Sequence, residues 1–174
     1  MELRPTYLIQ YEDIKHLVTI DSFFKLVELV ENTPGIKLSN LKAMDLVFCN
    51  GEPIRYGNGV YIFKSDERNY YVGNCVARNF TERIPAHFDI RKVGWFNSLL
   101  KAIAKYHNDE INNENLIKAA KFANDNLSLV LINFEIYNRD IINNLETLLG
   151  RSINPINKNF KKVKVIEGIV TDVI

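Results

Sequence analysis

The chain has 174 residues, of which 47% are hydrophobic and 25% are charged, as in a globular protein that can bury one sizeable core. No apolar run approaches the roughly 18 residues of a membrane-spanning helix, and the first residues lack the apolar segment of a secretory signal. We therefore expect a cytoplasmic protein with no membrane partner. Cys49 and Cys75 form neither a metal-binding spacing nor a disulfide framework, so we expect reduced, partly buried thiols.

The net charge is +1, but the charged residues are unevenly distributed along the chain. Acidic residues outnumber basic ones in residues 1–56, whereas residues 151–164 include basic residues and no acidic ones. In residues 78–105 the only acidic residues are Glu82 and Asp89, and they are outnumbered by the basic residues Arg78, Arg83, Arg91, Lys92, Lys101 and Lys105. The two basic blocks are compatible with a phosphate-binding face, although ordinary solvated surfaces give the same pattern.

Residues 1–56 read as a helical N-terminal extension. Asp21 or Ser22 is placed to cap a helix that runs to Glu31. The Asn32-Thr33-Pro34-Gly35 segment then ends it, and Ser39 is placed to cap a second short helix. No residue pattern here indicates chemistry, so we expect a packing element or a surface for a protein partner or for dimerisation.

Residues 59–73 read as two short strands joined by a polar turn. β-branched and aromatic residues fill both arms, and Ser65 to Asn69 lie between them. If Tyr61 and Tyr71 act together, their side chains must project from the same face of the sheet. They must then be paired directly or offset by an even number of residues.

After this hairpin, the pattern predicts helices and one long strand. We expect a helix from Asn74 to Ile84, ending before Pro85, and an amphipathic helix from Trp95 to Tyr106 with Trp95 and Phe96 in the core. A third helix is expected from Glu114 to Ala123.

The apolar segment from Leu127 to Tyr137 predicts a buried strand. Asn138 is placed to cap a last helix that ends at Gly150. Residues 161–174 form a tail that we expect to add an edge strand.

The hairpin also resembles a known family. Gly59-Val60-Tyr61 and Tyr71-Val72-Gly73 are similar to the paired tripeptides that name the GIY-YIG nucleases. Further positions follow the family's order. Arg83 lies on the next helix, two residues later than is usual in the family, and His87 follows four residues beyond it. Glu146, Pro155 and Asn157 follow in the family's order, but Pro155 and Asn157 are one residue closer together than usual.

The resemblance covers residues 57–160. It implies an α/β protein of the α+β type, in which helices flank a small central antiparallel sheet. The head (1–56) and the tail (161–174) would be additions to this nuclease core.

The resemblance also implies a metal-dependent endonuclease that hydrolyses phosphodiester bonds in DNA. Glu146 would hold Mg²⁺ or Mn²⁺, Arg83 would bind phosphate through its planar guanidinium, and Tyr61 would orient or deprotonate the attacking water. Tyr71, His87 and Asn157 would complete the catalytic site. Nucleic-acid contacts are expected from Arg78, Lys101, Lys105 and Lys158.

Two functions of other classes remain open at this point. One is a nucleic-acid-binding module that keeps the fold without turnover, and the other is a scaffold or interaction protein. A nucleophilic Cys75–His87 pair is a further alternative, but no third residue that would orient the histidine is evident in the sequence.

Overall fold

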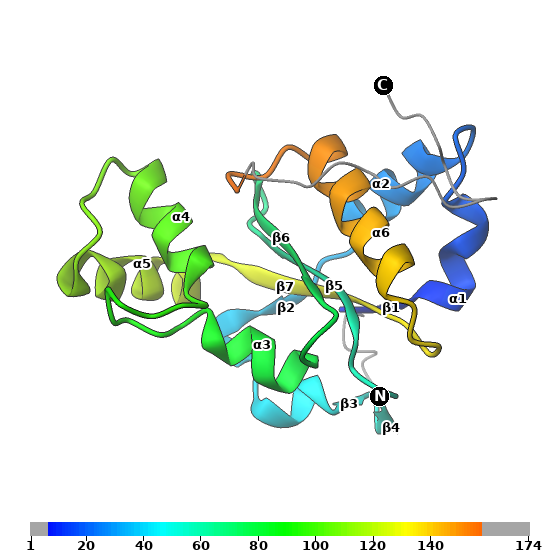
Figure 1. The fold of residues 1–174 in the computed structure, drawn as a ribbon, viewed down its shortest axis with the longest axis horizontal. Coiled ribbons are helices and arrows are strands. Elements are labelled where there is room, and N and C mark those ends of the chain that lie inside the picture. Colours follow the sequence, from blue (N-terminus) through cyan, green and yellow to red (C-terminus); the bar gives the residue numbers. More distant parts are fainter. Residues whose placement is uncertain (1–6, 158–174) are drawn as a thin grey trace.

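The computed structural model describes residues 7–157, and it places a sheet between two groups of helices (Figure 1). The helices are α1 (Tyr11–Ile14), α2 (Phe23–Asn32), α3 (Phe80–Ala86), α4 (Ser98–Tyr106), α5 (Asn113–Asn126) and α6 (Arg139–Ser152). The strands are β1 (Leu8–Gln10), β2 (Ile36–Lys37), β3 (Phe48–Cys49), β4 (Glu52–Pro53), β5 (Gly59–Lys64), β6 (Asn69–Cys75) and β7 (Ser128–Asn133). No helix within this part of the chain is long and apolar enough to cross a bilayer. The expected tail strand in 161–174 lies outside the described residues.

The main sheet has β7 and β5 at its centre. Among the described residues it has five strands in the order β1-β7-β5-β6, with β2 also pairing with β7. β5 pairs antiparallel with β6 and β7, and β1 pairs parallel with β7. The α/β class is therefore confirmed, but the sheet is mixed and not purely antiparallel as expected.

The N-terminal part of the chain contributes to this sheet. β1 and β2 both pair with β7, and β3 and β4 form a small hairpin of their own. The expectation of an exclusively helical head was therefore wrong in this respect. Strands of two or three residues are too short to show the alternation that would reveal them in the sequence.

Alternate residues of the central strands face different cores. Tyr61, Phe63 and Tyr71 pack with α3, α4 and α5, whereas Val60 and Ile62 pack with α2 and α6 on the opposite face. This separation follows from the two-residue period of a strand. It explains why every residue of β5 and β7 is buried, because helices cover both faces.

The hairpin register places the two tyrosines on one face. Tyr61 pairs with Gly73, and Phe63 pairs with Tyr71, so the tyrosines are offset by two residues. The expectation of a shared face is confirmed through the even offset and not through direct pairing. A register irregularity follows Phe63, after which Lys64 pairs with Asn69.

Glycine is required at both motif positions, 59 and 73, because other atoms lie too close to leave room for a side chain. A Cβ atom on Gly73 would lie 2.3 Å from the Tyr61 hydroxyl oxygen, because the tyrosine ring lies against this glycine. A Cβ on Gly59, where φ is +154°, would lie 1.9 Å from the carbonyl oxygen of Ile132 on β7. Gly59 therefore allows β5 to approach β7, and Gly73 makes room for Tyr61.

The boundaries of α3, α4 and α6 differ from expectation. β6 continues to Cys75, so α3 begins only at Phe80, and Pro85 lies inside the last turn of the helix. This position removes only one backbone N–H from the helical bonding, which a terminal turn tolerates. α4 begins at Ser98, which leaves Trp95 and Phe96 in the preceding loop and out of the core. α6 passes Gly150 and ends at Ser152, because Gly150 is buried within the helix and does not terminate it.

Lys64 at the end of β5 ties the hairpin to α2. Its buried ammonium group donates hydrogen bonds to the carbonyl oxygens of Val30 (3.2 Å) and Glu31 (2.6 Å), in the last turn of the helix. These carbonyls have no partner within the helix, and a cation there also complements the helix dipole. Burial lowers the pKa of Lys64 below its ordinary value.

Replacing this buried amine tests the connection. Lys64→Met keeps most of the apolar stem but leaves the carbonyls of Val30 and Glu31 without the donor, so we expect a loss of roughly 1–3 kcal/mol in unfolding free energy. Urea denaturation would measure it. The control, Lys121→Met on the exposed side of α5, should change stability by less than about 0.5 kcal/mol. Equal effects of the two substitutions would contradict a capping role for Lys64.

Candidate functional site

Two tyrosines and a histidine form a buried polar cluster beneath α3 and α4. The Tyr61 and Tyr71 rings are stacked, with centroids 6.1 Å apart and planes 7° from parallel. His87, which follows α3, packs edge-on against both rings and is fully buried. The Tyr71 hydroxyl lies 2.7 Å from the hydroxyl of Ser98 at the start of α4. The structure thus brings together three of the predicted catalytic residues.

Hydrogen bonding determines which nitrogen of His87 carries the proton. The Leu99 amide donates to His87 Nδ1 at 3.3 Å, so this nitrogen accepts. In a neutral imidazole the proton then lies on Nε2, which donates to the Tyr61 hydroxyl oxygen at 2.7 Å. Tyr61 is consequently the acceptor of this bond, and its own hydroxyl proton remains available for another acceptor.

Burial keeps this cluster neutral. Desolvation raises the pKa of Tyr61 well above its ordinary value of 10, and the nearby Tyr71 raises it further. The pKa of Tyr71 is raised for the same main reason. Burial lowers the pKa of His87 to about 3, and the positive charge of Arg83 contributes to this shift. Near neutral pH, both tyrosines are therefore protonated and His87 is uncharged.

Arg83 brings a positive charge to the edge of the cluster. It lies on α3, and its guanidinium carbon is 5.1 Å from the centre of the Phe96 ring. Its charge acts to lower the pKa of Tyr61 and of Tyr71, opposing the larger effect of burial. The Nη1 atom is buried and has no hydrogen-bond partner among the described residues. It is a charged donor with capacity to bind an anion.

Glu146 approaches the cluster from the other side of the sheet. It lies on α6, which packs on the face opposite the tyrosines, and the Asn74 side-chain amide donates to its carboxylate. Asn74 lies on β6, the outer strand of the sheet, so the glutamate reaches this edge. Its negative charge raises the pKa of Tyr71. Glu146 and Arg83 thus influence the same tyrosine from different directions.

The donor set limits which metal this edge could hold. Among residues 7–157 there is no group of three His, Cys, Asp or Glu side chains placed to bind one ion. A single carboxylate still suits Mg²⁺, which retains several water ligands and takes others from substrate phosphate. Asn74 would orient the carboxylate as an outer-shell partner. The residues present therefore fit magnesium and do not form a closed zinc-type cage.

Asn157 occupies a different position from the one expected. Its side-chain amide donates to the carbonyl oxygen of Val72 at 2.7 Å, and its oxygen accepts from the Val72 amide at 2.9 Å. The side chain thereby satisfies both main-chain groups of one residue on the edge of β6 that faces away from β5. Asn157 covers the sheet edge and positions Val72, next to Tyr71, instead of facing the tyrosine cluster.

Comparison of the chain with family models, with curated proteins and with solved structures gave no match. Its chemistry is therefore inferred from the residues themselves.

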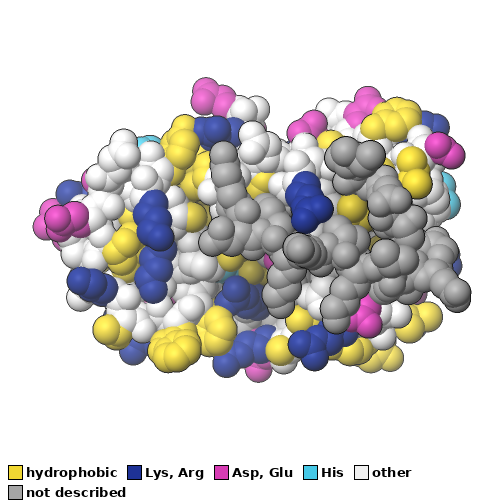
Figure 2. All heavy atoms as spheres, turned by 45° about the horizontal axis from the view of Figure 1, so that its top comes forward, with side chains coloured by type: hydrophobic (Ala, Val, Ile, Leu, Met, Phe, Trp, Pro, Cys, Tyr) yellow, Lys and Arg dark blue, Asp and Glu magenta, His cyan; other side chains and the backbone are white. Residues whose placement is uncertain are grey.

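The residues predicted to bind nucleic acid differ in how far their side chains are exposed and free to bind a ligand. Arg78 is exposed beside the cluster, with its guanidinium carbon 4.4 Å from the centre of the Phe96 ring. Lys105 is exposed on α4, whereas the Lys101 ammonium group donates to the Gly94 carbonyl oxygen at 2.7 Å. Lys158 lies outside the described residues. On the face drawn in Figure 2, several Lys and Arg side chains lie over the half of the molecule that carries α3, α4 and α5.

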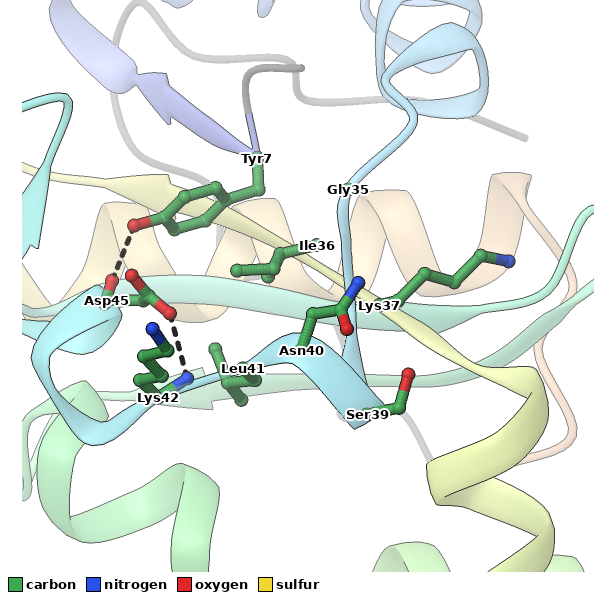
Figure 3. A pocket seen from close by; sticks show the side chains of 9 residues that line it. All are labelled: Tyr7, Gly35, Ile36, Lys37, Ser39, Asn40, Leu41, Lys42 and Asp45. Carbon is green, nitrogen blue, oxygen red and sulfur yellow. Dashed lines mark hydrogen bonds between the residues drawn. The ribbon is translucent and has the colours of Figure 1, made fainter. Parts of the chain in front are cut away.

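A separate hollow of about 600 Å³ lies beside β2 and the turns that follow it (Figure 3). Tyr7, Lys42 and Asp45 line it, and the Tyr7 hydroxyl donates to the Asp45 carbonyl oxygen at 2.7 Å. The Asp45 carboxylate in turn accepts from the Lys42 amide at 2.8 Å. None of the predicted catalytic residues is among the described residues that line it, so this hollow is distinct from the tyrosine cluster.

Several residues of the site were not expected from the sequence. Ser98 and Asn74 bind the predicted residues, and Phe96 lies beside two guanidinium groups. Ser98 and Asn74 belong to residue types that are common on any protein surface, so no sequence signal separates them from ordinary polar residues. Their role depends on which strands and helices meet.

The Cys75–His87 alternative receives no support. Both ring nitrogens of His87 already have other partners, Tyr61 and Leu99. Burial raises the pKa of the Cys75 thiol far above its ordinary range, so it carries no thiolate near neutral pH.

The neutral, buried state of His87 predicts a specific dependence of stability on pH. Its folded-state pKa of about 3 lies below the ordinary value of 6.5, so below pH 6.5 the unfolded chain binds a proton that the folded chain does not. The contribution of His87 to stability is present above pH 6.5 and is lost progressively as the pH falls toward 3. Between pH 6.5 and 5 we expect a loss of about 1–2 kcal/mol in urea denaturation.

His87→Gln should remove this slope, since glutamine does not titrate. The control, His107→Gln at an exposed position, should retain it. A parent protein whose stability stays constant from pH 6.5 to 5 would contradict the neutral, buried state of His87.

Proposed function

We propose that this protein is a metal-dependent endonuclease of the GIY-YIG type, acting on phosphodiester bonds in DNA. The observation that carries the proposal is the arrangement around Tyr71. Arg83 provides a positive charge and an unpartnered guanidinium nitrogen on one side, and Glu146 provides a negative charge on the other. Phosphodiester hydrolysis needs these two charges, one for the phosphate and one for a divalent metal.

Arg83 would bind and polarise the phosphate. Its planar fork of donors matches phosphate oxygens, and its contact with Phe96 holds the guanidinium near the tyrosines. The buried Nη1, which has no partner among the described residues, would donate to a phosphate oxygen of the substrate. Partial exclusion of water at this position strengthens that interaction.

The tyrosines would orient groups and would not act as bases. The raised pKa of Tyr61 keeps its hydroxyl protonated near neutral pH, and His87 holds the oxygen in place through Nε2–H. The hydroxyl proton is then directed toward an acceptor in the reacting complex. Tyr71, fixed by Ser98, would complete the same hydrogen-bonded network.

Glu146 would hold the metal ion, with Asn74 as its outer-shell partner. A bound Mg²⁺ or Mn²⁺ would supply charge neutralisation at the phosphate and activation of water. The protein's own contribution would be to place the carboxylate at the edge of β6, next to the strand that carries Tyr71.

One observation favours a second candidate, a nucleic-acid-binding module without turnover. Tyr61 is fully buried and Tyr71 almost so, which limits their direct contact with substrate. Such a module would retain Arg83 and the exposed basic residues for binding, and the tyrosine cluster would serve only to pack the core. Cleavage assays distinguish the two functions.

Substitution of Glu146 separates binding from turnover. Glu146→Gln removes the charge that holds the metal but no phosphate contact, so Mg²⁺-dependent nicking of plasmid DNA should disappear while DNA affinity stays within about twofold. Chelation of the metal should have the same effect on the parent protein. Glu52→Gln, at an exposed position in β4, is the matched control and should cleave normally. Cleavage by Glu146→Gln at the parental rate would remove this residue from the mechanism.

Tyr61 and Arg83 should act as one unit. Tyr61→Phe removes a single hydroxyl and should slow cleavage by roughly 10²–10³, as the loss of one oriented hydrogen bond does elsewhere. Arg83→Ala should cost at least as much, and Arg83→Lys should recover only part, because lysine lacks the planar fork. Since both residues would serve one transition state, the double variant should be much less than multiplicatively impaired.

Single-turnover cleavage rates would provide these values, with Arg139→Lys, at an exposed position at the start of α6, as the control. Because the Tyr61 pKa is raised, the parental rate should show no titration of this residue between pH 6 and 9. Fully multiplicative losses, or unchanged cleavage by Tyr61→Phe, would contradict the shared role.

A further inference from the structure

The loop between α3 and α4 presents an aromatic side chain to solvent. Trp95 is 91% exposed and is the single tryptophan of the chain. Val93, two residues earlier, is 78% exposed. Large apolar side chains at such exposure, gathered on one short loop, are typical of a binding surface and not of a core.

This loop is held in place by a set of polar contacts. The buried Asn97 side chain donates to the carbonyl oxygens of Asp89 (2.6 Å) and Arg91 (2.8 Å). The Arg91 guanidinium forms two hydrogen bonds with the Asp89 carboxylate, and Lys101 donates to the Gly94 carbonyl. Trp95 is therefore presented from an ordered backbone, which reduces the conformational entropy that binding would cost.

The surroundings of Trp95 are basic and adjoin the candidate active site. The neighbouring Phe96 ring lies within 4.4 Å of the Arg78 guanidinium carbon and 5.1 Å of that of Arg83. Residues 78–105 carry a surplus of positive charge, and Asp89, one of their two acidic residues, is paired with Arg91. A hollow of about 630 Å³ lies beside this loop, lined by Arg91, Trp95 and Phe96 among others.

We propose that Trp95 stacks on an unpaired base of the nucleic acid whose phosphate Arg83 binds. An exposed indole ring offers a stacking face that any base can use, and the cations around it complement the adjacent phosphates. Bases inside a regular duplex are stacked on one another and do not offer a free face. The substrate class is therefore a nucleic acid with a single-stranded or bulged nucleotide at the site. This inference rests on the proposed nucleic-acid substrate, and it is independent of whether cleavage follows.

The fluorescence of Trp95 tests the proposal directly, because no other tryptophan contributes to the signal. The full chain would be titrated, in the presence of chelator, with a single-stranded oligonucleotide, with a duplex carrying one bulged nucleotide, and with the fully paired duplex. Stacking should strongly quench the emission with the first two ligands and leave it nearly unchanged with the third. Anisotropy of the labelled oligonucleotides would provide the dissociation constants in parallel.

Substitutions at this position complete the test. Trp95→Ala should raise the dissociation constant for the bulged and single-stranded ligands by roughly 5- to 150-fold and that for the paired duplex by less than about twofold. Trp95→Phe should retain part of the affinity. Phe24→Ala, at an exposed aromatic on α2, is the control and should change neither. Because Trp95 is exposed, its replacement removes little packing, and a circular dichroism melt verifies that the fold is kept.

Four outcomes would overturn the inference. They are binding of the bulged ligand with unchanged emission, equal quenching by all three ligands, no binding of any ligand, and a dimer that Trp95→Ala converts to monomers in sedimentation. The proposed nuclease activity is tested separately with Mg²⁺ and Glu146→Gln. Stacking without cleavage would refute the nuclease alone, whereas cleavage without stacking would refute this inference alone.

Discussion

The contact between the Tyr61 ring and Gly73 determines how the centre of the molecule is built. Any side chain larger than hydrogen at residue 73 would collide with the ring, whose hydroxyl and Cζ atoms lie where a Cβ would be. The glycine thus allows a large aromatic residue to lie flat against the neighbouring strand and to direct its hydroxyl to His87. The pairing of Phe63 with Tyr71 follows from the same register and places the second ring beside the first.

This arrangement has an electrostatic consequence. A cluster buried so completely cannot carry charge without a partner, so the tyrosines remain protonated and His87 remains neutral. The charged groups of the site, Arg83 and Glu146, lie toward its margin and are less buried. The neutral centre is thus flanked by two opposite charges, those of Arg83 and Glu146.

The sequence predicts the hairpin well because its pattern is local. Alternating β-branched and aromatic residues on both arms indicate strands, and the requirement that Tyr61 and Tyr71 share a face follows from strand geometry. The Asn138 cap of α6 is confirmed as well, since its side chain accepts from the Ile141 amide. These features depend on residues close together in the chain.

Features that depend on distant contacts were not predictable in the same way. Trp95 and Phe96 fit the apolar stripe of α4, and periodicity does not distinguish a core residue from an exposed aromatic just before the helix. Asn157 follows the order of the family resemblance, yet its position is decided by its bonds to Val72 on the edge of β6, which exists only after the sheet has formed. β1 and β2 similarly become strands because β7 offers them an edge.

The difference in burial between the tyrosine–histidine cluster and the partly exposed Arg83 and Glu146 also constrains any reaction at this site. Neither Tyr61 nor His87 can take a proton from water, because burial keeps the Tyr61 hydroxyl protonated and disfavours the charged imidazolium form of His87. In the proposed reaction, proton transfer would therefore occur at the margin of the cluster, where Arg83 and Glu146 lie. In the proposed reaction, the tyrosine–histidine cluster would contribute by fixed orientation, and the dipoles of its hydroxyl groups would need no rearrangement when charge develops at the phosphate. The same packing that makes the cluster unsuitable as a base makes it suitable as a rigid support for Arg83.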